Sequence, residues 1–240
     1  MFVSPEAGLR FWRPRIENCD PRLLSLAAEL VGPGDVVWDV GANVGLFTFA
    51  AAGLAGPSGR VVAIEPDLWV VSLLRRSAKA NSNRLAHVDV LPVAVSDGLD
   101  VKTFHIARRG RSANFLEGFG LTDAGGSREI QWVPTVTLDW LLERFPAPQV
   151  LKIDVEGAEA LALRGARRML SEIRPVVLCE VAAENAGWVA EFLQAHEYLL
   201  LDADCPRGER QPLAQASWNT LAVAKPGAVM CGRPLTNAGS

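Results

Sequence analysis

Short apolar runs alternate with helix-like segments over most of this 240-residue chain, and this alternation limits its fold more than any other feature. The apolar runs are short, rich in branched residues and bounded by Gly, Pro or charged residues, as buried strands are. They lie at 36–40, 59–66, 87–95, 150–155 and 175–181, and the helix-like segments lie at 19–35, 43–55, 68–82, 139–145, 157–173 and 187–196. Such alternation predicts an α/β fold, a mostly parallel sheet with helices on both faces.

Two departures from this alternation add to the predicted fold. The runs 101–107 and 130–138 read as an extra pair of strands, and the segment 108–129 between them carries five glycines and no regular period. We therefore expect an inserted β-hairpin with a lid loop at 108–129. The last two strand-like runs, 198–204 and 219–225, leave no room for a helix between them, which allows one antiparallel strand.

The sequence predicts one principal domain with two short flanking segments. We expect an N-terminal helical cap segment at 1–34, the domain at 35–226 and a flexible tail at 227–240. The net charge of −3 gives no general attraction to nucleic acid, and the longest mostly apolar run, 44–56, is too short to span a bilayer. Four scattered cysteines without a CxxC pair favour a reducing, cytoplasmic location, and we expect neither a nucleic-acid partner nor an integral membrane segment.

The first predicted strand ends in Asp39 and Val40 and runs directly into Gly41-Ala42-Asn43-Val44-Gly45. In open α/β sheets, ligands bind outside the carboxyl ends of the strands, and glycines there let the backbone approach a ligand. Glu65 ends the second strand, about 20 residues further on, where a carboxylate can accept both hydroxyl protons of a ribose. The glycines alone would also suit a tight turn, but the combination is more specific.

Two adenosine cofactors compete for this loop. The dinucleotide fingerprint is GxGxxG, and Asn43 in place of its middle glycine would crowd a pyrophosphate. S-adenosylmethionine has no pyrophosphate, and its amino-acid end needs a carboxylate such as Asp39 near its ammonium group. The loop therefore favours S-adenosylmethionine, with an NAD(P)-dependent oxidoreductase as the alternative.

A second polar group follows the predicted strand 150–155, in the stretch KIDVEGAE. Its carboxyl end should lie beside the first strand, next to the glycine loop. Strand alternation places Lys152 and Asp154 on one face, so Asp154 and Glu156 lie at the mouth of the strand. Glu156 and Glu159 would also suit a helix N-terminus, so this group indicates a site only together with the loop.

The sequence resembles the FkbM family of S-adenosylmethionine-dependent methyltransferases. The stretch KIDVEGAE is the most distinctive of the matching pieces, which occur in the order of the family. They are WDVGANVGLFTF (38–49), VVAIEP (61–66), VAVSD (93–97), VPTVTLDWLL (133–142), LKIDVEGAEALALRGA (151–166) and RPVVLCEV (174–181).

The resemblance implies a Rossmann-like class I methyltransferase with a seven-stranded sheet, acting mostly as an O-methyltransferase on sugars, glycolipids or natural products. It implies a cofactor site in which Glu65 holds the ribose and Ser96 and Asp97 lie by the adenine. The residues expected at the methionine end are Asp39, Gly41, Asn43 and Gly45, and Ala42 and Pro66 belong to the same site. The serine-rich segment of the family is only loosely matched by RSANFLEG (111–118).

A hydroxyl acceptor benefits from a base that removes its proton. Asp154 is our first candidate, and Glu156 and Glu180 are alternatives that would otherwise bind acceptor hydroxyls. His105, in the inserted hairpin, is a further candidate, whereas the other two histidines, His87 and His196, lie at the wrong end of the sheet. Three carboxylates could hold a divalent cation, but nothing in their spacing demands it, and we expect no metal.

The acceptor is expected to be a small, sugar-containing or other secondary metabolite in natural product biosynthesis, with N-methylation of a peptide or amine as an alternative. The segments 1–34 and 108–129 would select it. Arg108, Arg109 and Arg111 read either as a solvated loop or as contacts to an anionic acceptor, and LRFWRPR (9–15) either covers the acceptor or packs on a sheet edge.

Overall fold

A computed structural model describes residues 1–4, 19–81, 84–108, 110–119 and 126–226. The stretch LRFWRPR, Arg109 and the tail 227–240 lie outside the described residues, as do parts of the expected cap segment and lid.

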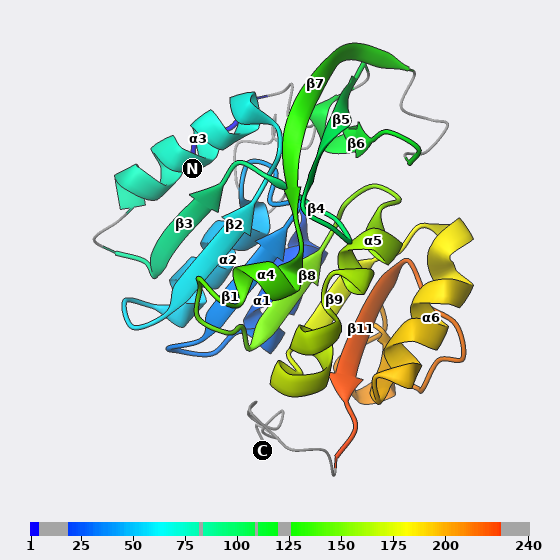
Figure 1. Cartoon of the computed structure of the whole chain (residues 1–240). Coiled ribbons are helices and arrows are strands. Elements are labelled where there is room, and N and C mark those ends of the chain that lie inside the picture. The colour runs from blue at the N-terminus through cyan, green and yellow to red at the C-terminus, as the bar shows by residue number, and fades with distance from the viewer. Residues whose placement is uncertain (5–18, 82–83, 109, 120–125, 227–240) are drawn as a thin grey trace.

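The main sheet has seven strands in the order β10-β11-β9-β8-β1-β2-β3 (Figure 1). Neighbours from β9 to β3 are parallel, whereas β11 runs antiparallel to both β9 and β10. The sheet and its one antiparallel strand confirm the predicted fold class. The strands are β1 (Val36–Val40), β2 (Arg60–Ile64), β3 (His87–Leu91), β8 (Val150–Ile153), β9 (Val176–Glu180), β10 (Tyr198–Asp202) and β11 (Asn219–Ala224).

Helices cover both faces of this sheet, and strand alternation decides which residues each face receives. In β1, Val37 packs with α1 (Pro21–Leu30) and α2 (Leu46–Ala55), whereas Trp38 packs on the opposite face. Buried residues of α3 (Leu68–Asn81) pack on the side of α2, through Ala63 and Leu74. The opposite face is covered by α4 (Leu138–Leu141), α5 (Glu159–Arg164), the π-helical turn Met169–Ile173 and α6 (Ala186–Ala195).

The expectation of one continuous helix over 157–173 is wrong, because α5 ends at Arg164. A Cβ on Gly165 would lie 2.3 Å from the Ser96 carbonyl oxygen, so the chain passes too close to its neighbour here for a larger residue. The π-helical turn Met169–Ile173 follows after this contact.

The extra strands form a second sheet in the order β4-β7-β5-β6, above the carboxyl ends of the main strands in Figure 1. Its strands are β4 (Ala94–Val95), β5 (Asp100–Ala107), β6 (Phe115–Leu116) and β7 (Ser127–Val136). The antiparallel β5–β7 pair is the predicted hairpin. The segment 108–129 is more regular than expected, because a 3-10 turn at Arg111–Ala113 leads into β6, which pairs with β5.

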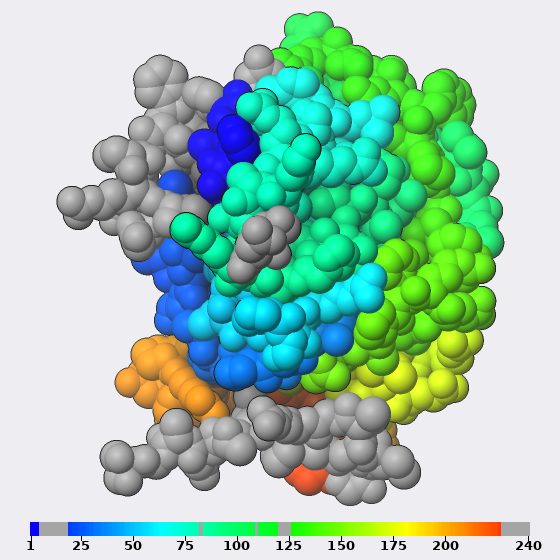
Figure 2. All heavy atoms as spheres, turned by 90° about the vertical axis from the view of Figure 1, so that its left-hand side faces the viewer, coloured from blue at the N-terminus to red at the C-terminus, as the bar shows by residue number. Residues whose placement is uncertain are grey.

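The described N-terminal residues lie on α3. The backbone N–H of Phe2 donates a hydrogen bond to Ser77 Oγ at 2.7 Å, and the Arg76 guanidinium lies 4.3 Å from the centre of the Phe2 ring. Figure 2 shows residues 1–4 against the outer side of this helix.

Candidate active site

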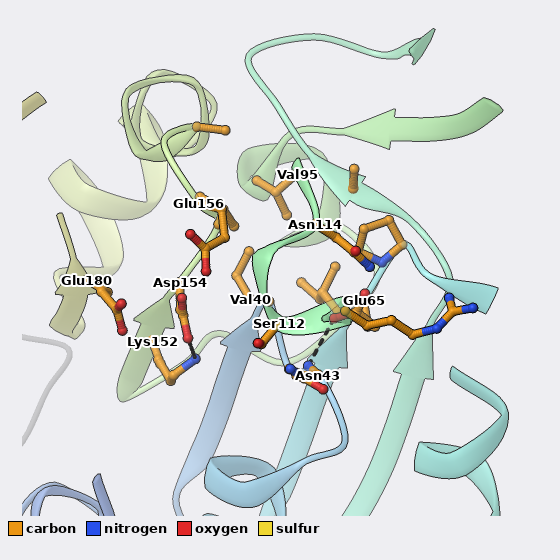
Figure 3. A pocket seen from close by; sticks show the side chains of 18 of the residues that line it. Val40, Asn43, Glu65, Val95, Ser112, Asn114, Lys152, Asp154, Glu156 and Glu180 are labelled. Atoms are coloured by element: carbon orange, nitrogen blue, oxygen red, sulfur yellow. Dashed lines mark hydrogen bonds and ion pairs between the residues drawn. The ribbon is translucent and has the colours of Figure 1, made fainter. Parts of the chain in front are cut away.

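A cavity of about 200 Å³ opens at the carboxyl edge of the main sheet, between this edge and the inserted hairpin. Its walls come from the loop after β1, the ends of β2, β8 and β9, and the segment that contains the 3-10 turn of the insert. Figure 3 shows the polar side chains that line it. The ionisable ones in the main sheet are Glu65, Lys152, Asp154, Glu156 and Glu180.

The glycine loop forms the floor of this cavity, and its backbone conformation requires glycine at position 41. Gly41 has φ 75°, and a Cβ there would lie 1.7 Å from the Asp154 carbonyl oxygen. The backbone N–H groups of Gly41 and Ala42 both donate to the Ile64 carbonyl, at 3.0 and 3.1 Å. The loop therefore joins the ends of β1, β2 and β8, which brings Asp154 to the cavity beside the loop. Gly41, Ala42 and Asn43 line the cavity, whereas Gly45 is not among its lining residues.

Glu65 reaches the cavity from the end of β2 and is only 7% exposed. Its carboxylate accepts hydrogen bonds from the backbone N–H of Asn43 and of Asp67, each at 2.9 Å. Burial raises the pKa of Glu65 to about 7 despite these two bonds, and the charges of Asp67 and Asp39 raise it further. Each carboxylate oxygen still has a lone pair for a ligand hydroxyl. Pro66, the next residue, also lines the cavity.

An ion triad of the buried Asp39 and Lys152 and the partly exposed Asp154 lies beside the floor. Lys152 Nζ lies 3.2 Å from Asp39 Oδ1 and 3.2 Å from Asp154 Oδ2. Burial opposes the charged form of Lys152, but the two carboxylates outweigh it and raise the pKa of the lysine above its usual value. Thr48 Oγ1 donates to the other oxygen of Asp39 at 2.6 Å. Asp39 is fully buried and does not line the cavity. The structure therefore does not support the expected direct contact between Asp39 and a ligand.

The three carboxylates proposed for chemistry lie on one side of the cavity. Asp154 follows β8, Glu156 occupies the next turn with φ 44°, and Glu180 ends β9 (Figure 3). Such a wall can accept hydrogen bonds from several hydroxyls or amines at once. Among the described residues, no group of three or more His, Cys, Asp or Glu side chains is arranged to hold a metal ion.

Ser96 and Asp97, expected by the adenine, do not line the cavity. After β3 the chain leaves the main sheet, and these two residues follow β4 of the second sheet, where the Ser96 N–H donates to the Val136 carbonyl. Ser96 Oγ accepts from Lys102 Nζ at 3.0 Å. The residues just before them, Val93, Ala94 and Val95, line the cavity instead.

His105 is also absent from the cavity wall. Its neighbour Phe104 lines the cavity, and successive side chains of a strand point to opposite faces, so His105 points away. The ring of His105 stacks on Phe115, with centroids 4.9 Å apart. This position removes the support for His105 as a base.

A polar cluster that was not expected from the sequence lies between the insert and α3. Arg111 is not on a solvated loop, because its side chain is 9% exposed and ion-pairs with Asp67, which is fully buried. Asn114 donates to the same Asp67 oxygen at 2.9 Å. Arg108 is exposed, and its guanidinium donates to the Ser127 carbonyl. Asp67 directly follows Glu65 and Pro66 at the end of the second predicted strand, and only this position could have indicated the cluster from the sequence.

Comparisons with known proteins show the family of the chain. A protein-family model described as "Methyltransferase FkbM domain" matches residues 39–205. The chain is 30% identical over 169 residues to the hexuronic acid methyltransferase AglP of Haloferax volcanii, covering 70% of this chain and 64% of AglP. It is 44% identical over 73 residues to the AMB antimetabolite synthetase AmbE of Pseudomonas aeruginosa, covering 30% of this chain and 3% of AmbE.

Among solved structures, the methyltransferase FkbM of Methylobacillus flagellatus has a similar fold. The TM-score is 0.50 at 14% identity, and the alignment covers 91% of this chain and 58% of that one. The chain thus spans less than two thirds of AglP and of this structure. No helix in the described ranges has the length and apolar character needed to cross a membrane.

Proposed function

The chain belongs to the FkbM methyltransferase family, and on this premise we propose that it uses S-adenosylmethionine to methylate a hydroxyl oxygen of a sugar, a glycolipid or a glycosylated natural product. The observation that carries the proposal is that the glycine loop, Glu65 and the carboxylates Asp154, Glu156 and Glu180 share one cavity.

The residues present fit this cofactor at two places. Glu65 offers acceptor lone pairs for the ribose hydroxyls, and Asn43 fixes this carboxylate through its backbone N–H. On the other side of the cavity, Asp154 and Glu156 provide negative charge near the floor. When bound, S-adenosylmethionine supplies a methyl group on a cationic sulfur, and carboxylates stabilise such a cation.

The protein's own residues then have separate roles in the proposed reaction. Lys152 holds the Asp154 carboxylate in place through its 3.2 Å contact, and Asp39 holds Lys152 from behind. Asp154 accepts the proton of the acceptor hydroxyl as that oxygen is methylated. Glu156 and Glu180 accept hydrogen bonds from further acceptor hydroxyls, which orients the reacting oxygen.

Three further observations support the details of the proposal. AglP is named a hexuronic acid methyltransferase, which supports a sugar-containing acceptor. The short match to an antimetabolite synthetase supports a place in natural product biosynthesis. Two of the described cysteines, Cys179 and Cys205, are free thiols, which supports a cytoplasmic location.

The test has a binding step and a transfer step. Isothermal titration should detect S-adenosylhomocysteine, and should detect no binding of NAD or NADP under the same conditions. Transfer is then measured by mass spectrometry with S-adenosylmethionine and three acceptor sets: neutral sugar glycosides, hexuronic acid glycosides, and amines or peptides. A methyl group gained only by the amines or peptides would contradict O-methylation, and binding of NADP alone would contradict the proposal as a whole.

A further inference from the structure

One wall of the cavity comes from the inserted hairpin rather than from the main sheet. It is the stretch Arg111–Asn114, which we call the insert wall, and all four of its residues line the cavity. The wall faces the same cavity as Glu65, although more than 40 residues separate them in the sequence. No cofactor role is expected for this stretch from the sequence.

Polar contacts with Asp67 hold the insert wall in position. The carboxylate of Asp67 is fully buried, and its Oδ2 accepts hydrogen bonds from the Arg111 guanidinium and from Asn114 Nδ2, the latter at 2.9 Å. The Arg111 guanidinium also lies 4.6 Å from the centre of the Trp69 ring. Asn114 Oδ1 accepts from the backbone N–H of Ala107 at 2.9 Å, which ties the wall to the end of β5. Both ends of the wall are thus held by polar contacts.

The same aspartate is linked to Glu65. The backbone N–H of Asp67 donates to Glu65 Oε1 at 2.9 Å, and Asp67 Oδ1 accepts from the backbone N–H of Trp69 at 3.0 Å at the start of α3. Asp67 therefore fixes the carboxylate expected to hold the ribose and also fixes the insert wall. A buried charge with this many partners permits little relative movement between the two.

Ser112 is a half-buried residue of this wall. Its hydroxyl lines the cavity, and within the described part of the chain it has no hydrogen-bond partner. Figure 3 shows Ser112 beside the same opening as Asn43 and Glu65. A serine hydroxyl can both donate and accept, which suits a ligand hydroxyl that already donates to a carboxylate.

We propose that the insert wall is part of the cofactor site and that Ser112 Oγ binds a ribose hydroxyl of S-adenosylmethionine alongside Glu65. Arg111, Asn114 and Asp67 are positioning residues that hold Ser112 at the cavity. This inference rests on the proposed function, because it assigns a further contact to the same cofactor. It also gives the insert a role in binding the methyl donor, beside the acceptor selection expected from its sequence.

The test measures binding, so it does not need the acceptor. S-adenosylhomocysteine is titrated calorimetrically into the wild-type protein and into Ser112→Ala, Ser112→Thr and Ser127→Ala. We expect Ser112→Ala to raise the Kd about fivefold, the effect of losing one neutral hydrogen bond. Ser112→Thr keeps the hydroxyl and should restore most of the affinity. Ser127 lies on β7 of the same insert, where its hydroxyl donates to the Glu129 carbonyl, so Ser127→Ala is the matched control and should bind as the wild type.

A second set of ligands separates a direct contact from a loss of local structure. Adenosine, 2′-deoxyadenosine and 3′-deoxyadenosine are titrated into the wild type and Ser112→Ala. A direct ribose contact predicts that the substitution weakens adenosine about fivefold and has no effect on the analogue that lacks the bonded hydroxyl. Equal weakening of all three ligands, or a Ser112→Ala Kd for S-adenosylhomocysteine within twofold of wild type, would overturn the inference.

The positioning residues are tested through Arg111→Met, which removes the ion pair but keeps much of the side-chain volume. It should raise the Kd of S-adenosylhomocysteine at least as much as Ser112→Ala does. In the double variant, Ser112→Ala should then change the Kd very little further, because Ser112 is no longer held in place. Additive effects of the two substitutions would contradict the positioning role. A folded wild-type protein that does not bind S-adenosylhomocysteine at all would overturn the proposed function together with this inference, whereas wild-type binding with silent Ser112 variants would overturn only the inference.

Discussion

The state of charge of Glu65 should control cofactor binding near neutral pH. Burial raises the pKa of Glu65 to about 7 in the ligand-free protein, and a carboxyl accepts two ribose hydroxyl protons only when it is ionised. If only the ionised form binds, the apparent Kd equals the intrinsic Kd divided by the fraction of Glu65 that is ionised. With a pKa of about 7 this fraction falls roughly tenfold between pH 8 and pH 6, so the Kd of S-adenosylhomocysteine should rise by nearly tenfold.

Calorimetric titration at half-unit steps from pH 6 to pH 8 measures this dependence. Glu65→Gln is the matched variant, because glutamine has a similar shape and no proton to lose in this range. It should bind more weakly than the wild type at pH 8 and show little change of Kd with pH. A wild-type Kd that is constant from pH 6 to pH 8, or a Glu65→Gln variant with the same slope, would refute the reasoning.

The same pKa predicts a dependence of stability on pH with a definite sign. The folded-state pKa of about 7 lies above the ordinary glutamate pKa of 4.5, so the folded protein binds more protons than the unfolded chain between these values. The contribution of Glu65 is therefore fully present below pH 4.5 and is lost as pH rises through about 7, by roughly 3 kcal/mol in all. Urea unfolding of wild type and Glu65→Gln gives the difference, and a difference that does not change with pH would contradict the raised pKa.

Three other substitutions test the buried groups beside the floor of the cavity. Lys152→Met should lower the free energy of unfolding by about 3–5 kcal/mol, because it leaves the buried Asp39 without its cation. Urea denaturation measures this loss, and the double variant Lys152→Met, Asp39→Asn should recover part of it. Asp154→Asn should reduce turnover at least a hundredfold while the Kd of S-adenosylhomocysteine stays within a few-fold, as expected of a base; turnover near wild type would remove Asp154 from that role. Gly41→Ala should lower the melting temperature and abolish cofactor binding, since its Cβ would lie 1.7 Å from the Asp154 carbonyl oxygen; a variant with wild-type melting temperature and affinity would contradict the close approach.

The fold could be predicted because its signals are local. The apolar run of β1, the glycines after it and the position of Glu65 are set by strand length, backbone freedom and the geometry of one sheet edge. Gly165 shows the limit: α5 ends just before it, where the chain passes close to the Ser96 carbonyl, and nothing near Gly165 in the sequence indicates that neighbour.

The candidate site was predictable only where it belongs to the main sheet. Asp154 and Glu180 end parallel strands, so the topology alone brings them to one edge. The direction of the inserted hairpin is a tertiary property, and it decides that Phe104 rather than His105 faces the cavity and that Ser96 is carried away from it. Arg111 is likewise buried by a distant partner, Asp67, and an arginine in a glycine-rich segment gives no sign of this.

A crystal structure of the protein with S-adenosylhomocysteine would test the central claim most directly. We expect the ribose hydroxyls to lie within hydrogen-bonding distance of Glu65 and the sulfur to face the side of the cavity that holds Asp154 and Glu156. A nucleoside bound away from Glu65, or a sulfur that faces away from these carboxylates, would contradict it.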